Sequence, residues 1–187
     1  MSKSSLADPV KLVFSVLARD VSFIREVMEL LARMYGPVDF VSAVLPFDYT
    51  DYYCAEMGEH LCRRFLSMEN LIRPESLPDI KQATNAIEDR FSEDSKRRVN
   101  IDPGYVSKTN LILATGKNFT HRVYLRDGVY ADLTLIYQGK QFRQLPWTYP
   151  DYAEEKQKTM MGKIREKYLW QLRGAEKERR EIRKASV

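Results

Sequence analysis

The chain has 187 residues, of which 44% are hydrophobic and 30% charged, with two cysteines and a net charge of +4. This composition is ordinary for a globular protein and excludes a class that depends on disulfides for its stability. No run approaches the roughly 18 consecutive apolar residues that a membrane span needs, and the N-terminus lacks the apolar core of a signal peptide. We therefore expect a cytoplasmic protein with no membrane partner, whose charge is too small to indicate nucleic-acid binding by itself.

The distribution of charge sets the last residues apart. Residues 173–187 contain six lysines and arginines against three glutamates, and few of their side chains are apolar. Such a stretch is typical of a solvated helix end. We therefore expect a single α+β domain over residues 1–172, followed by a basic, solvated helix end or tail over residues 173–187.

Apolar periodicity predicts a β-α-β unit at the start of the chain. Val10–Ala18 and Val38–Phe47 are apolar runs that indicate buried strands. Between them, apolar residues repeat at helical spacing over residues 23–34. Asp20 or Ser22 can accept hydrogen bonds from the first free backbone amides of this helix. This opening is the most strongly patterned part of the sequence.

The middle of the chain predicts shorter elements. Tyr52–Met57 and His60–Ser67 indicate two antiparallel strands, although the apolar spacing of the second would also suit a helix. A second amphipathic helix is expected between Pro74 and about Phe91. The sequence NIDPGY, residues 100–105, predicts a type II turn, because proline presets φ and the glycine after it supplies a positive φ.

The second half of the chain predicts a hairpin. Short apolar runs indicate four strands: Thr109–Thr115, His121–Leu125, Val129–Tyr137 and Gln141–Leu145. A three-residue loop over residues 126–128 places Arg122 opposite Asp132. Tyr124 then lies opposite Tyr130. We prefer this register to that of a two-residue loop because it separates polar from apolar side chains.

A final helix carries apolar residues from Met160 to Leu172 along one side. Because the later strands come as hairpins without regular crossover helices, the predicted class is α+β and not a doubly wound parallel sheet. We expect a mostly antiparallel sheet with packed helices, a ferredoxin-like sandwich in particular, and a long C-terminal helix.

Signatures of phosphate-binding and hydrolytic enzymes are incomplete. Residues 114–120 contain Gly-Lys, but Leu111 stands where a phosphate-binding loop needs its first glycine. Asn118 replaces the Ser or Thr that would hold magnesium. The sequence also lacks a Gly-x-Ser-x-Gly nucleophile elbow and a Gly-x-Gly-x-x-Gly loop.

The two cysteines do not predict a metal site. Cys54, His60 and Cys62 would supply three zinc ligands at loose spacing, whereas a structural zinc site usually uses four. We therefore expect two free thiols beside a surface histidine.

Hydroxyls and carboxylates gather where the strand at residues 38–47 ends and on the predicted hairpin. If these regions face one cleft, they form a polar, tyrosine-rich site for an anionic small molecule such as a nucleotide. The predicted ligand-binding residues are Asp48, Tyr49, Tyr52, Tyr53, Lys117, Arg122, Tyr124 and Asp132. For the hairpin, the alternative is an exposed ion pair beside an aromatic pair, with no ligand.

Within such a site the residues have different expected roles. The two basic side chains would hold phosphate. Asp48, Glu56 and Asp102 would bind sugar hydroxyls or a metal such as Mg²⁺. His121 could donate a hydrogen bond or act as an acid or base. The catalytic candidates are thus His121, Glu56 and Asp102, and the sequence does not decide whether the protein is an enzyme.

Two alternative functions come from other features. Trp147, Tyr149 and Tyr152 form an amphipathic aromatic patch ahead of a basic helix, which is also compatible with an RNA-binding or RNP-associated module. The chain could instead be a structural or interaction protein whose last helix, residues 155–187, packs on a partner. The oligomeric state does not follow from the sequence.

Four segments in order carry a resemblance: KLVFSVLA, FDYTDYYCAEMG, NIDPGYVSKTNLILATGKNFTHRVYL and WTYPDY. Together they resemble an uncharacterised bacterial and archaeal family that is known only as a domain of unknown function. The resemblance extends from about Pro9 to Tyr168. It implies at most nucleotide binding, because proteins of this kind are sometimes labelled GTP-binding. The chain has no Asn-Lys-x-Asp guanine-binding motif, and the resemblance supplies no catalytic residues.

Overall fold

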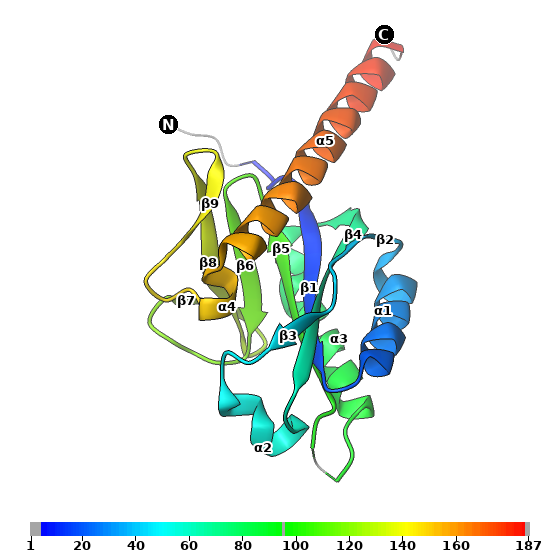
Figure 1. The fold of residues 1–187 in the computed structure, drawn as a ribbon. Coiled ribbons are helices and arrows are strands. Elements are labelled where there is room, and N and C mark those ends of the chain that lie inside the picture. Colours follow the sequence, from blue (N-terminus) through cyan, green and yellow to red (C-terminus); the bar gives the residue numbers. More distant parts are fainter. Residues whose placement is uncertain (1–4, 95, 186–187) are drawn as a thin grey trace.

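The computed structural model describes residues 5–94 and 96–185. Within them, the strands form one nine-stranded antiparallel sheet with helices on both faces, which confirms the predicted α+β class (Figure 1). The strands are β1 (Val10–Ala18), β2 (Val38–Val41), β3 (Leu45–Phe47), β4 (Leu61–Ile72), β5 (Val99–Val106), β6 (Asn110–Thr115), β7 (Arg122–Arg126), β8 (Val129–Gln138) and β9 (Gln141–Gln144). The helices are α1 (Val21–Tyr35), η1 (Asp51–Tyr53), α2 (Cys54–Met57), η2 (Pro74–Ser76), α3 (Leu77–Arg90), α4 (Pro150–Ala153) and α5 (Glu155–Ala185).

The first half of the chain has the predicted ferredoxin-like connectivity. β1, α1, β2, β4, α3 and β5 follow one another as β-α-β-β-α-β. Their strands lie in the order β2-β4-β1-β5, and β6, β8 and β7 extend the sheet beyond β5. β3 pairs with β4, and β9 pairs with β8. The ferredoxin-like unit is therefore one part of a wider sheet.

The two faces of the sheet have separate hydrophobic cores. Leu12 and Phe14 of β1 belong to the core that α1 and α3 cover. Val13 belongs to the opposite core, where it joins Met161 and Ile164 of α5. β1 is apolar along nearly its whole length because side chains on both of its faces are buried.

The long helix α5 crosses its face of the sheet and projects past it (Figure 1). A buried polar cluster fastens it there. Lys11 of β1 is fully buried and donates to the Asp39 carboxylate and to Gln171 Oε1, the latter at 2.8 Å. Lys167 adds an ion pair with Asp39 at 3.2 Å. Burial lowers the pKa of Lys11, although the Asp39 carboxylate favours its charged form.

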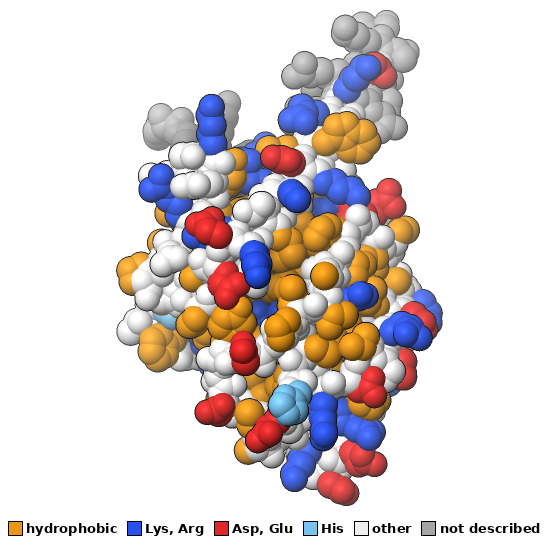
Figure 2. Space-filling model, viewed as in Figure 1, with side chains coloured by type: hydrophobic (Ala, Val, Ile, Leu, Met, Phe, Trp, Pro, Cys, Tyr) orange, Lys and Arg blue, Asp and Glu red, His pale blue; other side chains and the backbone are white. Residues whose placement is uncertain are grey.

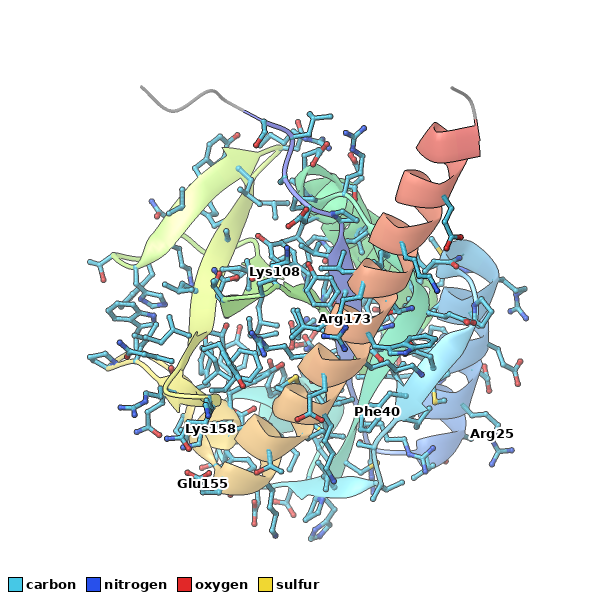
Figure 3. All side chains as sticks on the ribbon, turned by 90° about the horizontal axis from the view of Figure 1, so that it is seen from above. Arg25, Phe40, Lys108, Glu155, Lys158 and Arg173 are labelled. Atoms are coloured by element: carbon cyan, nitrogen blue, oxygen red, sulfur yellow. The ribbon has the colours of Figure 1, made fainter. Side chains whose placement is uncertain are left out.

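α5 covers only part of this face. Hydrophobic side chains gather on the surface between α5 and α1, over β2 and β3 (Figure 2). Seen from above, Phe40 lies between the two helices (Figure 3). Phe40 and Leu45 are partly buried against the core of this face. The core therefore reaches the surface beside α5.

In the described part of the chain, no helix is long and apolar enough to cross a membrane.

Two of the predicted strands differ from the structure, and a third is confirmed. The predicted strand Val38–Phe47 is interrupted at residues 42–44, which separate β2 from β3. Tyr52–Met57 is not a strand, because it forms most of η1 together with α2. The side chain of Thr50 caps η1 by accepting a hydrogen bond from its backbone. The prediction at His60–Ser67 is confirmed by β4.

The NIDPGY segment lies within β5 and does not form the predicted turn. Pro103 pairs with Phe14 in the middle of the β1–β5 ladder. Gly104 lies opposite Leu113 of β6, and a Cβ on Gly104 would be 2.4 Å from the Ile112 carbonyl oxygen. The position therefore needs glycine because β5 and β6 approach closely there, and not because φ is positive.

The predicted hairpin register is confirmed for three residue pairs: Arg122–Asp132, Val123–Ala131 and Tyr124–Tyr130. The loop is shorter than predicted. Asp127 and Gly128 make the turn, with φ values of 53° and 74° that suit a two-residue hairpin. Leu125 lies at a bulge, and this irregularity keeps the rest of the register as expected.

Candidate ligand-binding cleft

A cleft opens where β5 and β6 separate. The two strands pair only from Gly104–Leu113 to Val106–Leu111. Beyond that point lies a cleft of about 720 Å³. Segments that are far apart in the sequence line it at the lower end of the sheet in Figure 1: the region from β3 to η1, the start of the β6–β7 loop, α3 and α4. The cleft thus follows from the divergence of two neighbouring strands.

Two side chains of α3 take the place of a neighbouring strand beside β5. The Ile101 amide donates to Glu88 Oε1 at 2.7 Å, and the Ile101 carbonyl accepts from Lys81 Nζ at 3.1 Å. Because these side chains satisfy buried backbone groups, β5 can leave β6 without unpaired polar atoms at this residue. Burial raises the pKa of Glu88, although Lys81 and Arg97 favour its ionised form.

A buried arginine forms part of the wall. Arg63 of β4 pairs with Asp151 of α4, and their side chains are only 8% and 7% exposed. The guanidinium lies 4.3 Å from the centroid of the Phe47 ring. Burial disfavours the charged form, but the combined attraction of Asp151, Tyr152 and Asp102 outweighs it and the pKa of Arg63 is raised. Arg63 Nε is buried and has no hydrogen-bond partner among the described residues.

Lys117 and Arg122 lie together in another part of the lining. Arg122 Nε donates to Asp132 Oδ2 at 2.8 Å, and its Nη2 donates to the Tyr149 hydroxyl at 2.7 Å. Its Nη1 donates to the backbone carbonyl of Lys117 at 2.9 Å. The exposed Lys117 ammonium donates to the Tyr52 hydroxyl at 2.6 Å. Arg122 is therefore neutralised by a carboxylate, whereas the side-chain partner of Lys117 is neutral.

His121 lies behind Asp132 and does not line the cleft. Its Nε2 is 3.3 Å from Asp132 Oδ2, and its ring stacks on Trp147 with centroids 5.1 Å apart. Trp147 donates its indole N–H to the Leu133 carbonyl at 2.8 Å. The imidazole is thus placed to orient the Asp132 carboxylate and has no direct contact with the cleft.

The tyrosine-rich segment 48–57 is tied to other parts of the chain by its side chains. The Tyr49 hydroxyl donates to Glu154 Oε1 at 2.5 Å, which raises the pKa of Tyr49 to about 12. Glu56 accepts two hydrogen bonds from the Arg97 guanidinium, at 2.7 and 2.8 Å, and they lower the pKa of Glu56. Both carboxylate oxygens of Glu56 are therefore already hydrogen-bonded to Arg97.

The structure brings most of the predicted site residues together. The predicted residues that line the cleft are Tyr49, Tyr52, Tyr53, Asp102, Lys117, Arg122 and Asp132. Asp48 and Tyr124 do not line it, and both are exposed. Tyr124 packs on the Tyr130 ring at 5.2 Å, as the aromatic-pair alternative expected. Glu56 and His121 lie one layer away, each bound to a residue that lines the cleft.

Several lining residues were not predicted from the sequence: Arg63, Lys81, Asn85, Glu88, Arg97, Asn100 and Asp151. For three of them the sequence contains a pattern that indicates a buried charge. Arg63 lies between Leu61 and Phe65 at a spacing of two residues along β4, so its side chain shares their buried face. Lys81 and Glu88 lie seven residues apart among the buried residues of α3. A charged residue at an apolar position indicates a paired buried charge.

The described residues contain no group of three or more His, Cys, Asp or Glu side chains that could hold a metal ion. The prediction of free thiols is confirmed for Cys54 and Cys62. Magnesium in the cleft would need oxygen ligands from a bound molecule in addition to those of the protein.

Every residue that lines the cleft falls between positions 47 and 152. A family described as a domain of unknown function (DUF4416) matches residues 8–168 and so includes all of them. The chain belongs to this family. The match confirms the resemblance seen in the sequence, and DUF4416 membership assigns no activity to the cleft. No curated protein and no solved structure matches the chain. The function therefore has to be inferred from the chemistry of the cleft.

Proposed function

We propose that the cleft binds an anionic small molecule such as a nucleotide. This proposal rests on the surroundings of the Lys117 ammonium. Its side-chain partner is a neutral hydroxyl, that of Tyr52, and none of the described carboxylates lies within ion-pairing distance of it. A lysine ammonium is a point charge that suits phosphate, so its charge is available to a ligand.

The remainder of the cleft supports the same proposal. Arg63 uses Nη1 on Asp151 and keeps a buried Nε without a partner in the described part of the chain. The Tyr52 and Tyr53 rings meet edge to face with centroids 5.0 Å apart, and aromatic faces of this kind can flank a planar ring. The volume of about 720 Å³ lies within the range of roughly 300–1,000 Å³ that small-molecule sites occupy.

A thermal-shift screen with nucleoside mono-, di- and triphosphates, with and without Mg²⁺, tests the proposal. A ligand that binds only the folded state adds about 2.7 kcal/mol of apparent stability at 100 times its Kd. Lys117→Met is expected to weaken binding about tenfold or more, because hydrogen bonds to charged groups contribute about 1.5–3 kcal/mol.

Lys163→Met is the matched control, because Lys163 is exposed on α5 and does not line the cleft. It is expected to leave the Kd unchanged. The proposal fails if no nucleotide shifts the melting temperature, or if the two lysine variants lose binding equally.

RNA binding and partner binding through α5 remain predictions from the sequence. The aromatic side chains of the RNA hypothesis already have intramolecular roles. Trp147 donates to the Leu133 carbonyl, the Tyr149 hydroxyl accepts from Arg122, and Tyr152 is only 4% exposed. Because these contacts help to build the cleft, binding of a small molecule has the stronger support.

A further inference from the structure

Asp102 presents an unused acceptor to the cleft. It belongs to β5 just beyond the point where β5 and β6 separate, and its side chain is 34% exposed. Its Oδ2 accepts from Asn100 Nδ2 at 2.8 Å. Its Oδ1 lies 4.0 Å from Lys81 Nζ, too far for a hydrogen bond, and none of the described residues donates a hydrogen bond to it.

The charge of Asp102 acts on other residues that line the cleft. Burial is the main cause of the raised pKa of Tyr53 and of Tyr152, and Asp102 raises both further. It also favours the charged form of Arg63 on the wall. Asp102 lines the cleft and acts electrostatically on three other lining residues from different elements.

The surroundings of Asp102 select the kind of group that it could bind. A cationic group of the ligand at Asp102 Oδ1 would also approach Lys81 Nζ, which lies 4.0 Å from that oxygen, and like charges repel at this distance. A metal ion would need several oxygen ligands, and the described residues provide no cluster of them. A neutral hydrogen-bond donor meets neither obstacle. Sugar hydroxyls are donors of this kind, and a carboxylate is the group that holds ribose hydroxyls in dinucleotide-binding sites.

We infer that the ligand is a phosphorylated sugar compound, whose phosphate binds Lys117 and whose sugar hydroxyls donate to Asp102 Oδ1. This inference rests on the proposed function of the cleft. It extends that proposal from any small anion to a ligand that carries both a phosphate and sugar hydroxyls. The same chemistry is present in a ribonucleotide and in a free sugar phosphate. Asp102 is then the residue that distinguishes ribose from deoxyribose.

The test compares a ribonucleoside monophosphate, its 2′- and 3′-deoxy counterparts and ribose 5-phosphate by isothermal titration calorimetry. With the unmodified protein, we expect at least one deoxy compound to bind about 10- to 100-fold more weakly, since a hydroxyl bonded to a charged acceptor contributes about 1.5–3 kcal/mol. In Asp102→Ala the ratio of the Kd of the deoxy compound to the Kd of the ribonucleotide should fall towards one. Asp89→Ala, an exposed carboxylate on α3 that does not line the cleft, should preserve it. Ribose 5-phosphate shows whether the base contributes.

Two outcomes separate this inference from the proposed function. If the monophosphates bind and Lys117→Met weakens them, but the ratio is the same in Asp102→Ala and the unmodified protein, the role of Asp102 is wrong and anion binding stands. If neither the monophosphates nor ribose 5-phosphate bind, both ideas fail. Asp102→Asn, which keeps the side-chain shape, replaces the alanine variant if that variant does not fold, and its ratio should also fall.

Discussion

The pair formed by Arg63 and Asp151 should be among the most sensitive points of the protein. Their side chains are 8% and 7% exposed, so either charge would remain buried if the other were removed. Removing one partner of a buried pair typically costs about 3–5 kcal/mol. Arg63→Met would also lose the cation–π contact with Phe47, which contributes about 0.5–2 kcal/mol. We therefore expect Arg63→Met and Asp151→Leu each to destabilise the fold by about 3–5 kcal/mol.

The double variant Arg63→Met with Asp151→Leu should be less destabilised than the sum of the two single variants. Apolar replacement of a whole buried pair is often neutral, because no uncompensated charge remains. The expected coupling energy is at least about 2–3 kcal/mol, the upper end of values for residues in contact.

Urea unfolding at pH 7 measures these changes, because the free energy of unfolding is extrapolated linearly to zero denaturant. Arg25→Met is the matched control, since Arg25 is exposed on α1 and points away from the body of the molecule (Figure 3). It should change stability by less than about 0.5 kcal/mol. Single-variant costs below about 1 kcal/mol, or additive costs in the double variant, would refute the reasoning.

Three further changes test other parts of the fold by the same unfolding measurement. Asp39→Ala should cost about 3–5 kcal/mol, because it leaves the buried Lys11 ammonium without a carboxylate, and Lys11→Met only about 1–2, because Asp39 keeps its ion pair with Lys167; equal costs would contradict this. Gly104→Ala should lower stability by about 1–3 kcal/mol, because its Cβ would meet the Ile112 carbonyl oxygen at 2.4 Å; an unchanged stability would contradict the close approach. Glu56 has a lowered pKa in the folded state, so its stabilisation is present above its ordinary pKa of 4.5 and lost as pH falls through the lowered value. The stability difference from Glu56→Gln should therefore shrink below pH 4.5, and a pH-independent difference would count against the Arg97 contact.

Local patterns in the sequence were enough for part of the fold. The register of the hairpin followed from the alternation of polar and apolar residues around Arg122 and Asp132, because a slip of one residue would reverse both faces. The helical form of Tyr52–Met57 did not follow, since the segment has few apolar residues to give a period. Its turn depends on the Thr50 cap and on contacts with distant residues such as Arg97.

The divergence of β5 and β6 could not be predicted from either strand. It depends on Lys81 and Glu88, which reach from α3 to the backbone of Ile101 and precede that residue by 20 and 13 positions. The end of the β5–β6 ladder also explains why NIDPGY suggested a turn. Pro103 and Gly104 are rare inside strands, and here they lie where pairing with β6 ends. A Pro-Gly pair between apolar residues can therefore mark the end of a ladder as well as a turn.

Charge pairing inside the cleft decides where an anion can bind. Four of the five basic residues that line it have a carboxylate partner: Arg63 with Asp151, Lys81 with Glu88, Arg97 with Glu56, and Arg122 with Asp132. An anion at any of these four must compete with a carboxylate that the fold already holds in place, and separating such a pair is costly. Lys117 has no such competitor in the described part of the chain. The buried pairs should therefore govern stability, while one exposed lysine governs affinity for the ligand.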